Sequence, residues 1–196
     1  MRRQARAELT RLRLLEASVD ALVAKGYSGA TTQEVCRRAA CSRGTLLYHF
    51  PKREDLLVAS LHHVLSSRVA AFVEEHKDVQ PFDVSTFLTA LWAQWQGPAL
   101  VAWLELAVAA RTNAALRAPM RETMQDFDRQ ILTAFRTLQP LGPVPPALEE
   151  PALMLTFAVL NGLAVSQSYE QDGPADSVIG LLTGVSSLIA HSEVMP

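Results

Sequence analysis

The sequence GYSGATTQEVCRRAACSRGTLLYHFPKREDLL, residues 26–57, decides the fold of this chain. It predicts a short helix with Thr31 at its N-cap and the carboxylate of Glu34 three residues later, the pattern of a capping box. A turn of three residues follows, and its last residue, Ser42, is expected to cap a second short helix. Pro51 ends this second helix and stands at the start of the next one.

The pair of short helices has the features of a helix-turn-helix. The second helix, Arg43–Phe50, is rich in Arg, Thr, Tyr and His and contains no Asp or Glu. A major groove accepts a slender helix of this kind, with its first turn aimed at the base edges. The glycine at position 44 lets the backbone approach the sugar-phosphate chain closely. The segment therefore predicts DNA binding.

Hydrophobic periodicity predicts helices along the rest of the chain. A first helix carries apolar residues at positions 12, 15, 19 and 22 and ends near Gly26. No segment shows the alternation that is typical of a strand. After the helix that begins at Pro51, the expected helices are Phe82–Gln96, Pro98–Thr112, Ala115–Leu138, Ala147–Tyr169 and Asp176–His191, with loops at residues 139–146 and 172–174. We predict an all-α fold.

Composition and charge agree with a head that binds a polyanion. Hydrophobic residues make up 49% of the 196 residues and charged residues 19%, which indicates a globular chain. Residues 1–56 hold 11 Lys/Arg against 6 Asp/Glu, whereas residues 57–196 hold 7 against 14. We therefore expect a helix-turn-helix DNA-binding domain over residues 1–56, and a larger helical domain over residues 57–196 that avoids polyanions.

Neither a signal peptide nor a membrane span is expected. Charged residues, among them Arg11, Arg13 and Glu16, interrupt the basic N-terminus before a continuous apolar region can form. Two stretches without charge, Val84–Leu104 and Pro151–Tyr169, are long enough to cross a bilayer, but their polar content fits buried helices of a soluble protein better. The expected location is the cytoplasm.

Residues 26–57 resemble the DNA-binding domain of the tetracycline-repressor (TetR) family of transcriptional regulators. The matching positions are Gly26, Tyr27, Thr31, Ala39, Ser42, Gly44, Thr45, Leu46, Tyr48, His49, Phe50, Lys52, Arg53, Glu54, Leu56 and Leu57. The resemblance implies an N-terminal three-helix domain and a larger helical domain that binds a ligand and forms a homodimer. It also implies a pseudo-palindromic double-stranded DNA operator and a small-molecule effector, with no cofactor and no metal.

The same resemblance implies DNA contacts, residue by residue. Base-edge or nearby phosphate contacts are expected at the start of the recognition helix, where Arg43 is suited to a bidentate pair with guanine. Phosphate contacts are expected from Thr31 and Thr32, from Tyr48 and His49 on the recognition helix, and from Arg53 at the start of the next helix. Arg2, Arg3 and Arg6 are expected to form an arm that adds nonspecific attraction. The predicted DNA-binding residues are Thr31, Thr32, Ser42, Arg43, Gly44, Thr45, Tyr48, His49, Lys52 and Arg53.

Two residues depart from the family's pattern. Ala40 stands in the turn where the family usually has glycine, and a left-handed alanine costs on the order of 1 kcal/mol. Leu47 stands where many members have a tyrosine that reaches DNA. Leu47 cannot donate a hydrogen bond, so either that contact is missing or the side chain touches a thymine methyl group.

The second domain holds the expected ligand pocket and dimer interface. The helix Pro98–Ala110 is apolar almost all round, so we expect it to be buried. Its one ionisable residue, Glu105, is expected to pair with an arginine such as Arg111 or Arg121; the alternative is a cationic or hydrogen-bonding effector. Predicted pocket residues are Trp92, Trp95, Trp103, Glu105 and Met124, although core packing is an equal alternative for the tryptophans. The predicted interface residues are Leu153, Phe157, Leu160, Val178, Leu181 and Val185, with Gly162, Gly180 and Gly184 allowing close packing.

Other functions are less well supported by the sequence. No Ser/His/Asp set, phosphate-cradling glycine loop or metal-spaced carboxylate cluster occurs, so an enzyme is not expected. His62 and His63 are adjacent on one helix and point in different directions, so a shared metal is not expected either. Cys36 and Cys41 are interpreted as small buried residues, and the alternative is a redox switch. A regulator governed by a protein partner or by thiol state remains the second hypothesis.

Overall fold

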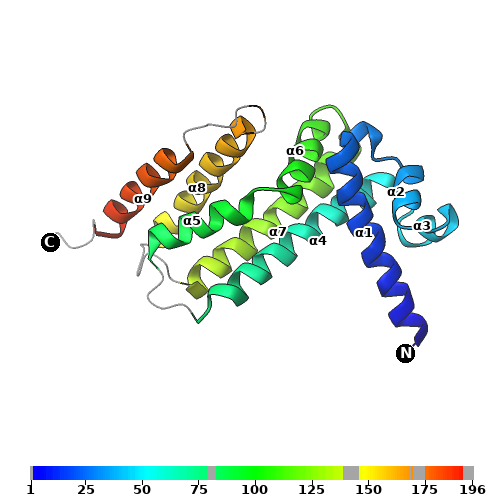
Figure 1. Cartoon of the computed structure of the whole chain (residues 1–196), viewed down its shortest axis with the longest axis horizontal. Coiled ribbons are helices and arrows are strands. Elements are labelled where there is room, and N and C mark those ends of the chain that lie inside the picture. The colour runs from blue at the N-terminus through cyan, green and yellow to red at the C-terminus, as the bar shows by residue number, and fades with distance from the viewer. Residues whose placement is uncertain (1, 79–82, 139–145, 168, 170–174, 192–196) are drawn as a thin grey trace. The chain divides into compact units, whose positions relative to one another are not determined.

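The structure is a computed structural model that describes residues 2–78, 83–138, 146–167, 169 and 175–191. Over these residues it contains only helices: α1 (Arg2–Gly29), α2 (Thr32–Arg38), α3 (Arg43–His49), α4 (Arg53–His76), α5 (Val84–Trp95), α6 (Pro98–Ala110), α7 (Ala114–Leu138), α8 (Pro146–Gln167) and α9 (Ala175–His191) (Figure 1). The prediction of an all-α fold is confirmed. The predicted loops at 139–146 and 172–174 lie, apart from residue 146, outside the described residues.

Residue contacts divide the chain into two compact units. The first unit comprises Met1–Arg68 and Gly97–Asp128, and the second comprises Val69–Gln96 and Arg129–Pro196. The first unit extends beyond α1–α3 because α6 packs extensively against α1. The predicted boundary between residues 56 and 57 is a division by function, and it stays a prediction.

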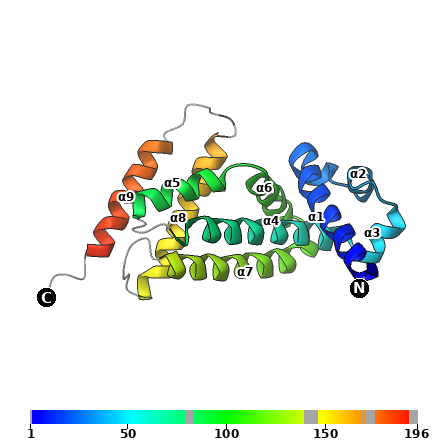
Figure 2. The ribbon, with the colours of Figure 1, turned by 60° about the horizontal axis from the view of Figure 1, so that its bottom comes forward.

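The first unit holds the helix-turn-helix. α1 packs against α2 and α6, and α2 packs against α3 (Figure 2). Leucines fill its core, because the apolar positions of each helix recur every three or four residues and face the same side. The fully buried ones are Leu14, Leu15, Leu22, Leu46, Leu56, Leu57, Leu61, Leu106 and Leu116.

The end of α1 depends on a glycine. Gly26 has φ 65° and ψ 179°, which interrupts the helix at the residue where the sequence predicts its end. A Cβ at Gly26 would lie 3.0 Å from Oε2 of Glu105. An L residue at this position would therefore be strained by its backbone conformation and crowded by a neighbouring carboxylate. Gly26 thus allows the chain to leave α1 and turn toward α2.

The second unit is built around α5, which packs against both α8 and α9. α5 begins at an N-cap that the sequence analysis did not identify: Oδ1 of Asp83 accepts a hydrogen bond of 2.8 Å from the backbone N–H of Thr86, and this bond lowers the pKa of Asp83. Trp95 ends the helix, and its indole N–H donates to Oδ1 of Asn161 on α8 at 3.0 Å. The ring of Trp95 also meets Phe157 edge to face, with centroids 4.8 Å apart.

Two of the described helices are long and apolar enough to cross a membrane by length and composition. They are α4 and residues Ala147–Gln167 of α8. Core helices of soluble proteins meet the same criterion. In α4 the side chains of Leu56, Leu57 and Leu61 are fully buried in the first unit, which is the position of a core helix.

Candidate nucleic-acid interface

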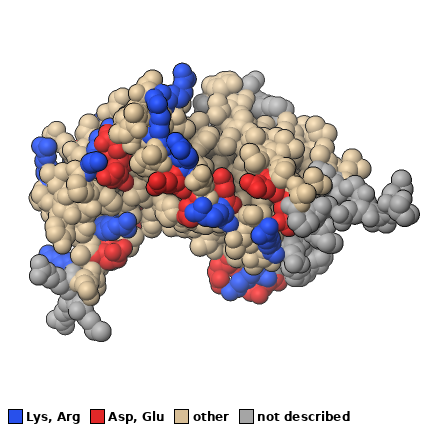
Figure 3. Space-filling view, turned by 180° about the vertical axis from the view of Figure 1, so that it is seen from behind, with Lys and Arg blue, Asp and Glu red and all other residues tan. Residues whose placement is uncertain are grey.

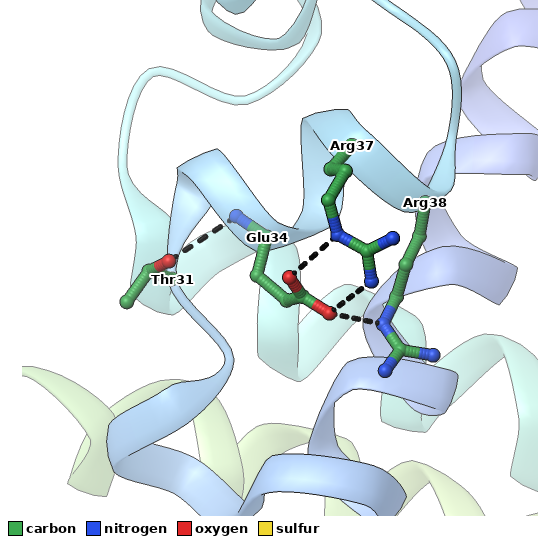
Figure 4. Close-up of polar contacts among 4 residues, drawn as sticks. All are labelled: Thr31, Glu34, Arg37 and Arg38. Atoms are coloured by element: carbon green, nitrogen blue, oxygen red, sulfur yellow. Dashed lines mark hydrogen bonds and ion pairs between the residues drawn. The ribbon is translucent and has the colours of Figure 1, made fainter.

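The first helix of the helix-turn-helix has the predicted cap at its N-terminus. Oγ1 of Thr31 accepts a hydrogen bond of 3.2 Å from the backbone N–H of Glu34 (Figure 4). The reciprocal half of the predicted capping box is not formed. The carboxylate of Glu34 turns instead toward the end of the helix and pairs with Arg37 and Arg38, each at 2.7 Å. Two charge-assisted partners replace the single backbone N–H that a capping box would offer.

This ion-pair cluster neutralises part of the positive charge of α2. Hydrogen bonds from Arg37 and Arg38 lower the pKa of Glu34 to about 2. The carboxylate therefore stays ionised throughout the physiological pH range, and the two arginines stay paired with it. On the face drawn in Figure 3, too, acidic atoms lie beside basic ones instead of leaving a wholly basic field. We expect other basic residues to provide the attraction to DNA.

The second helix of the motif, α3, presents a free outer face. Its N-cap is Ser42, as predicted, because Oγ of Ser42 accepts a hydrogen bond of 3.1 Å from the backbone N–H of Thr45. Leu46 faces inward with no exposed surface, whereas Tyr48 is 80% exposed. Arg43 and Gly44 are exposed too, at helical spacing from Leu47 and Tyr48. These four residues form the outer face of α3, and it carries no acid.

Gly44 is not required by the packing of the chain itself. A Cβ at this position would meet no neighbour nearer than Oγ of Ser42 at 3.8 Å. Leu47, which departs from the family's pattern, is 41% exposed on the same outer face and is free to contact an apolar group. The space at Gly44 is therefore available to something outside the chain, such as a DNA backbone.

We expect Gly44→Ala to separate stability from DNA binding. Alanine should stabilise the helix by up to about 1 kcal/mol, because it has a smaller backbone entropy cost and open space for its methyl group. The same methyl group should weaken binding to DNA duplexes. Thermal unfolding and fluorescence anisotropy with labelled DNA would measure the two effects. Unchanged affinity in a stabilised variant would show that the backbone at residue 44 does not approach DNA.

Arg53, for which the resemblance implied a phosphate contact, makes several contacts within the chain. Its Nε donates to the carbonyl oxygen of Ala30 at 2.9 Å, and its Nη2 donates to the carbonyl oxygen of Tyr27. The guanidinium also lies over the ring of Tyr27, 4.2 Å from the centroid. These contacts fasten the start of α4 to the end of α1. The phosphate contact of Arg53 stays a prediction, and a loss of DNA binding in Arg53→Ala would not identify it, because the substitution also removes these contacts within the chain.

The remaining predicted DNA-binding residues lie along the same motif. Thr31 precedes α2 and is exposed, whereas Thr32 at its first position is half-buried, as are Thr45 and His49 of α3. Lys52 is exposed just before α4, which leaves its ammonium group available for a phosphate. Of the expected N-terminal arm, Arg6 is exposed, and the side chains of Arg2 and Arg3 lie outside the described residues.

Ala40 has the left-handed conformation that the sequence analysis considered. Its φ is 48°, so the turn carries a strain on the order of 1 kcal/mol that glycine would not have. The turn forms nevertheless, because Ala39 is buried behind it and Ser42 caps the next helix. The departure from the family's pattern therefore affects stability and leaves the shape of the motif intact.

Comparison with known proteins agrees with this geometry. Residues 14–60 match the model of the bacterial regulatory proteins of the tetR family, a segment that contains α2, α3 and the start of α4. Over residues 14–60 the chain has the DNA-binding domain of the TetR family. It is a helix-turn-helix transcriptional regulator that binds DNA, and its relatives and structural neighbours are regulators of the same kind.

Three matches extend over most of the chain. An uncharacterised HTH-type transcriptional regulator of Mycobacterium tuberculosis, Rv2912c, is 29% identical over 165 residues, which are 83% of this chain and 84% of that protein. A TetR-family regulator from Rhodococcus sp. is 26% identical, with a TM-score of 0.68 over 92% of this chain and 98% of the other. A transcriptional regulator from Saccharomonospora viridis, solved in complex with choline, has the same fold at 20% identity, with a TM-score of 0.67 over 94% of this chain and 97% of the other.

The predicted ligand-pocket residues fall in both units of the regulator. Trp92 and Trp95 are buried on α5 in the second unit, and the hydrogen bond to Asn161 gives Trp95 a core role. Trp103 and Glu105 on α6, and Met124 on α7, are half-buried in the first unit. The expected burial of α6 is only partial, because Val108 is 61% exposed. A pocket formed by these residues stays a prediction.

Glu105 has a partner that the sequence analysis did not consider. Its Oε2 accepts a hydrogen bond of 2.7 Å from the backbone N–H of Tyr27, which follows the break in α1 at Gly26. Within the described residues the carboxylate forms no ion pair with Arg111 or Arg121. The predicted arginine pairing is therefore replaced by a contact with the backbone of the DNA-binding segment.

Tyr27 connects this contact to two further helices. Its hydroxyl oxygen accepts a hydrogen bond of 2.8 Å from Nδ2 of Asn113, just before α7, and lies 3.5 Å from Oε1 of Glu54 on α4. Tyr27, Glu54, Glu105 and Asn113, together with Arg53, are called the Tyr27 cluster below. Sequence reasoning missed the cluster because up to 86 residues separate its partners.

The first unit also contains an open groove of about 660 Å³ between α1, α4 and α7. At its edge, Nε2 of His62 lies 2.7 Å from Oδ2 of Asp126. No group of three metal-ligating side chains forms among the described residues. None of the predicted pocket residues lines the groove; its lining consists of Arg11, Leu15, Asp55, Val58, Ala59, His62, His63, Ser66, Ser67, Pro119, Glu122 and Thr123.

The predicted dimer-interface residues divide into two groups. Leu153 and Leu160 are buried by the chain's own helices, so they have little or no surface left for a partner. Phe157 and Val178 are half-buried, and Phe157 packs on Trp95 within the second unit. Leu181 is 70% exposed and Val185 is 37% exposed. Only the last two lie on a largely free surface.

The helices α8 and α9 have an apolar outer face, and the sequence predicted its apolar side chains on α9 but not those on α8. Sequence periodicity selected the inner stripe of α8, whereas the exposed stripe is the neighbouring one. Cβ atoms added at Gly162 and Gly184, which lie within this outer face, would meet nothing within 4 Å. The outer face consists of Met154, Leu155, Ala158, Gly162 and Val165 on α8 and of Leu181, Gly184, Val185 and Leu188 on α9.

Proposed function

We propose that this regulator is a cytoplasmic homodimeric repressor that leaves a pseudo-palindromic operator when a small hydrophobic effector binds. The observation that carries the proposal is the acid-free, exposed outer face of α3, held on a capped helix beside a basic N-terminal segment. Such a face suits the edges of bases in a major groove. The family's regulators bind DNA as dimers, so two α3 helices would lie in successive grooves, about 34–36 Å apart.

The outer face of α8 and α9 is the proposed contact between the two subunits. Exposed apolar residues recur on α9 at positions 181, 185 and 188, one face of the helix. A face of this kind on each of two helices can form a four-helix bundle with its copy around a two-fold axis. The exposed glycines permit the helices to approach closely. Burying this face would remove apolar surface that is unusual on a monomer.

The Tyr27 cluster supports a route from effector to DNA. Glu105 lies on α6 and Asn113 precedes α7, two elements beyond the predicted DNA-binding domain, and both bind the residue that begins the connection between α1 and α2. A displacement of α6 by an effector would change the position at which α2 and α3 are held. The effector must favour the released conformation by several kcal/mol to empty the operator.

The proposed effector is mainly apolar and need not carry a positive charge. The choline complex of the Saccharomonospora viridis neighbour supports small-molecule binding by this fold. In this chain the carboxylate of Glu105, which was a candidate partner for a cationic effector, already accepts a hydrogen bond from the backbone N–H of Tyr27. Binding of a lipophilic effector should therefore depend on apolar area, with polar groups fixing orientation.

The proposal is tested by replacing two basic residues that are exposed in the structure. The operator is first selected from a random duplex library with the wild-type protein. Arg43→Ala should relax preference at one base step, with a loss of about 1–3 kcal/mol of discrimination. Lys52→Ala should weaken binding to every duplex alike and reduce the salt slope by about one. Anisotropy titrations at several salt concentrations would measure both.

Lys77→Ala provides the matched control, because it removes one exposed positive charge outside the helix-turn-helix. It should change neither sequence preference nor affinity by much. A uniform loss in both Arg43→Ala and Lys52→Ala would make Arg43 a phosphate contact. Failure to select any duplex from the library would contradict the proposed operator.

A further inference from the structure

The turn between α2 and α3 brings the two cysteines of the chain together. The backbone N–H of Cys41 donates a hydrogen bond of 3.1 Å to the carbonyl oxygen of Cys36, a bond that spans five residues. Ala39 is the C-cap of α2, and the next residue, Ala40, is left-handed. These features define a Schellman motif, in which Cys36 and Cys41 hold the two positions whose side chains commonly pack together.

The Schellman motif fixes the separation of the two backbones. A hydrogen bond between the N–H of one residue and the carbonyl of the other keeps the two Cα atoms within about 6 Å, inside the range of natural disulfides. Both thiols are free and half-buried, so small reagents can reach them. Their proximity has an electrostatic signature as well. Burial raises the pKa of the Cys41 thiol, and the neighbouring Cys36 thiol raises it further, whereas Arg13 opposes the shift.

We propose that Cys36 and Cys41 are a modification site, at which a low-molecular-weight disulfide oxidises the pair to a reversible intrachain disulfide. The site lies between the C-terminal turn of α2 and the residue before Ser42, the cap of α3. It adds a covalent bond to the segment that presents α3. The inference does not depend on the proposed effector or operator, because it concerns the chemistry of the turn alone.

The reaction consists of two thiol–disulfide exchanges. Either cysteine can attack first, and the exchange is the same with the two residues interchanged; Cys36 is taken as the attacking residue. Its thiolate attacks one sulfur of the small disulfide and displaces one small thiolate, which leaves a mixed disulfide on Cys36. Cys41 then loses its proton, attacks the sulfur of Cys36 and displaces the second small thiolate. The two protein protons end on the two small thiols, and the two electrons reduce the small disulfide.

The folded turn should favour the disulfide over the unfolded chain. In the unfolded chain the two cysteines must close a loop of six residues, whereas in the folded chain the hydrogen bond from Cys41 to Cys36 has already closed it. If the folded geometry accepts the bond without strain, loop-closure entropy makes the disulfide about 40-fold more favourable in the folded state. By linkage the oxidised protein should unfold at a higher temperature, by about 5 °C.

Equilibration of the full chain with glutathione buffers of graded redox potential would test the proposal. Thiols are trapped with a maleimide, and mass spectrometry counts the protein that carries two, one or no labels, in buffer and in concentrated urea. The expected result is an effective thiol concentration about 40-fold higher in buffer than in urea. Reduction with dithiothreitol should restore two labelled thiols.

Cys36→Ser and Cys41→Ser are the matched controls. Each retains one thiol and should accumulate the glutathione mixed disulfide, with no species that lacks both labels and glutathione. An effective concentration in buffer equal to or below that in urea would overturn the proposal, because it would show that the folded turn disfavours the bond. Disulfides between chains as the main product would overturn it as well.

Discussion

Replacing Leu181 by aspartate is expected to convert the proposed dimer to monomers and to lower affinity for the proposed operator by about 100-fold or more. Leu181 is 70% exposed in the single chain, so a charge there is harmless until a partner covers it. In the proposed bundle the carboxylate would be buried without a counter-charge, at a cost of several kcal/mol per subunit. Each monomer then binds one half-site without help from a second. Sedimentation velocity and anisotropy with operator DNA would measure the two losses.

Val108→Asp is the control for this result. Val108 on α6 is also a largely exposed apolar residue, at 61%, but it lies in the first unit and outside the proposed interface. The variant should remain dimeric. Monomers from Val108→Asp together with dimers from Leu181→Asp would move the interface from α9 to α6.

Replacing Glu105 by alanine is expected to lower the free energy of unfolding by about 2 kcal/mol. The change removes the carboxylate that accepts a hydrogen bond from the Tyr27 N–H, in a half-buried region where water compensates poorly. It also releases the connection between α1 and α2 from α6, so DNA binding should weaken as well. Chemical denaturation followed by circular dichroism, and anisotropy with DNA below the unfolding transition, would measure both effects.

Glu105→Gln and Glu75→Ala make this test specific. Glutamine keeps an oxygen acceptor and lacks the charge, so its stability should fall between wild type and Glu105→Ala. Glu75→Ala removes an exposed carboxylate near the end of α4 and should change the free energy of unfolding little. Equal stability of Glu105→Ala and wild type would show that the contact with Tyr27 contributes nothing measurable.

Local features of the sequence predicted the helices and their ends well. The caps at Thr31 and Ser42, the break in α1 at Gly26 and the left-handed Ala40 all depend on residues within a few positions of one another. Short-range hydrogen bonding and backbone preference act over that distance. The exception is Glu34. Its carboxylate could bind either the backbone N–H of a capping box or nearby arginines, and it pairs with Arg37 and Arg38.

Features that depend on distant partners could not be predicted in the same way. The partner of Glu105 is a backbone N–H 78 residues away. Almost every residue has a backbone N–H, so the residue type does not identify such a partner. Arg53 matched a family position, but the sequence could not show its hydrogen bonds to the carbonyl oxygens of Ala30 and Tyr27, which lie 23 and 26 residues away. On α8, an apolar stripe predicts that its residues are buried, but it does not show whether they pack against the same chain or against a second subunit. Leu160 is covered by its own chain, and Met154 is 67% exposed.

The packing of α1 against α6 has a consequence for the order in which the nascent chain folds. A ribosome releases α1, α2 and α3 well before α6 and Asn113 have been made, and chains fold from the N-terminus as they emerge. Until α6 arrives, the core of the first unit lacks Leu106 and the end of α1 lacks Glu105. In a nascent chain whose synthesis stops before α6, α3 is therefore held by an incomplete core. We therefore expect the chain to become competent for DNA binding only after more than half of its residues have been synthesised.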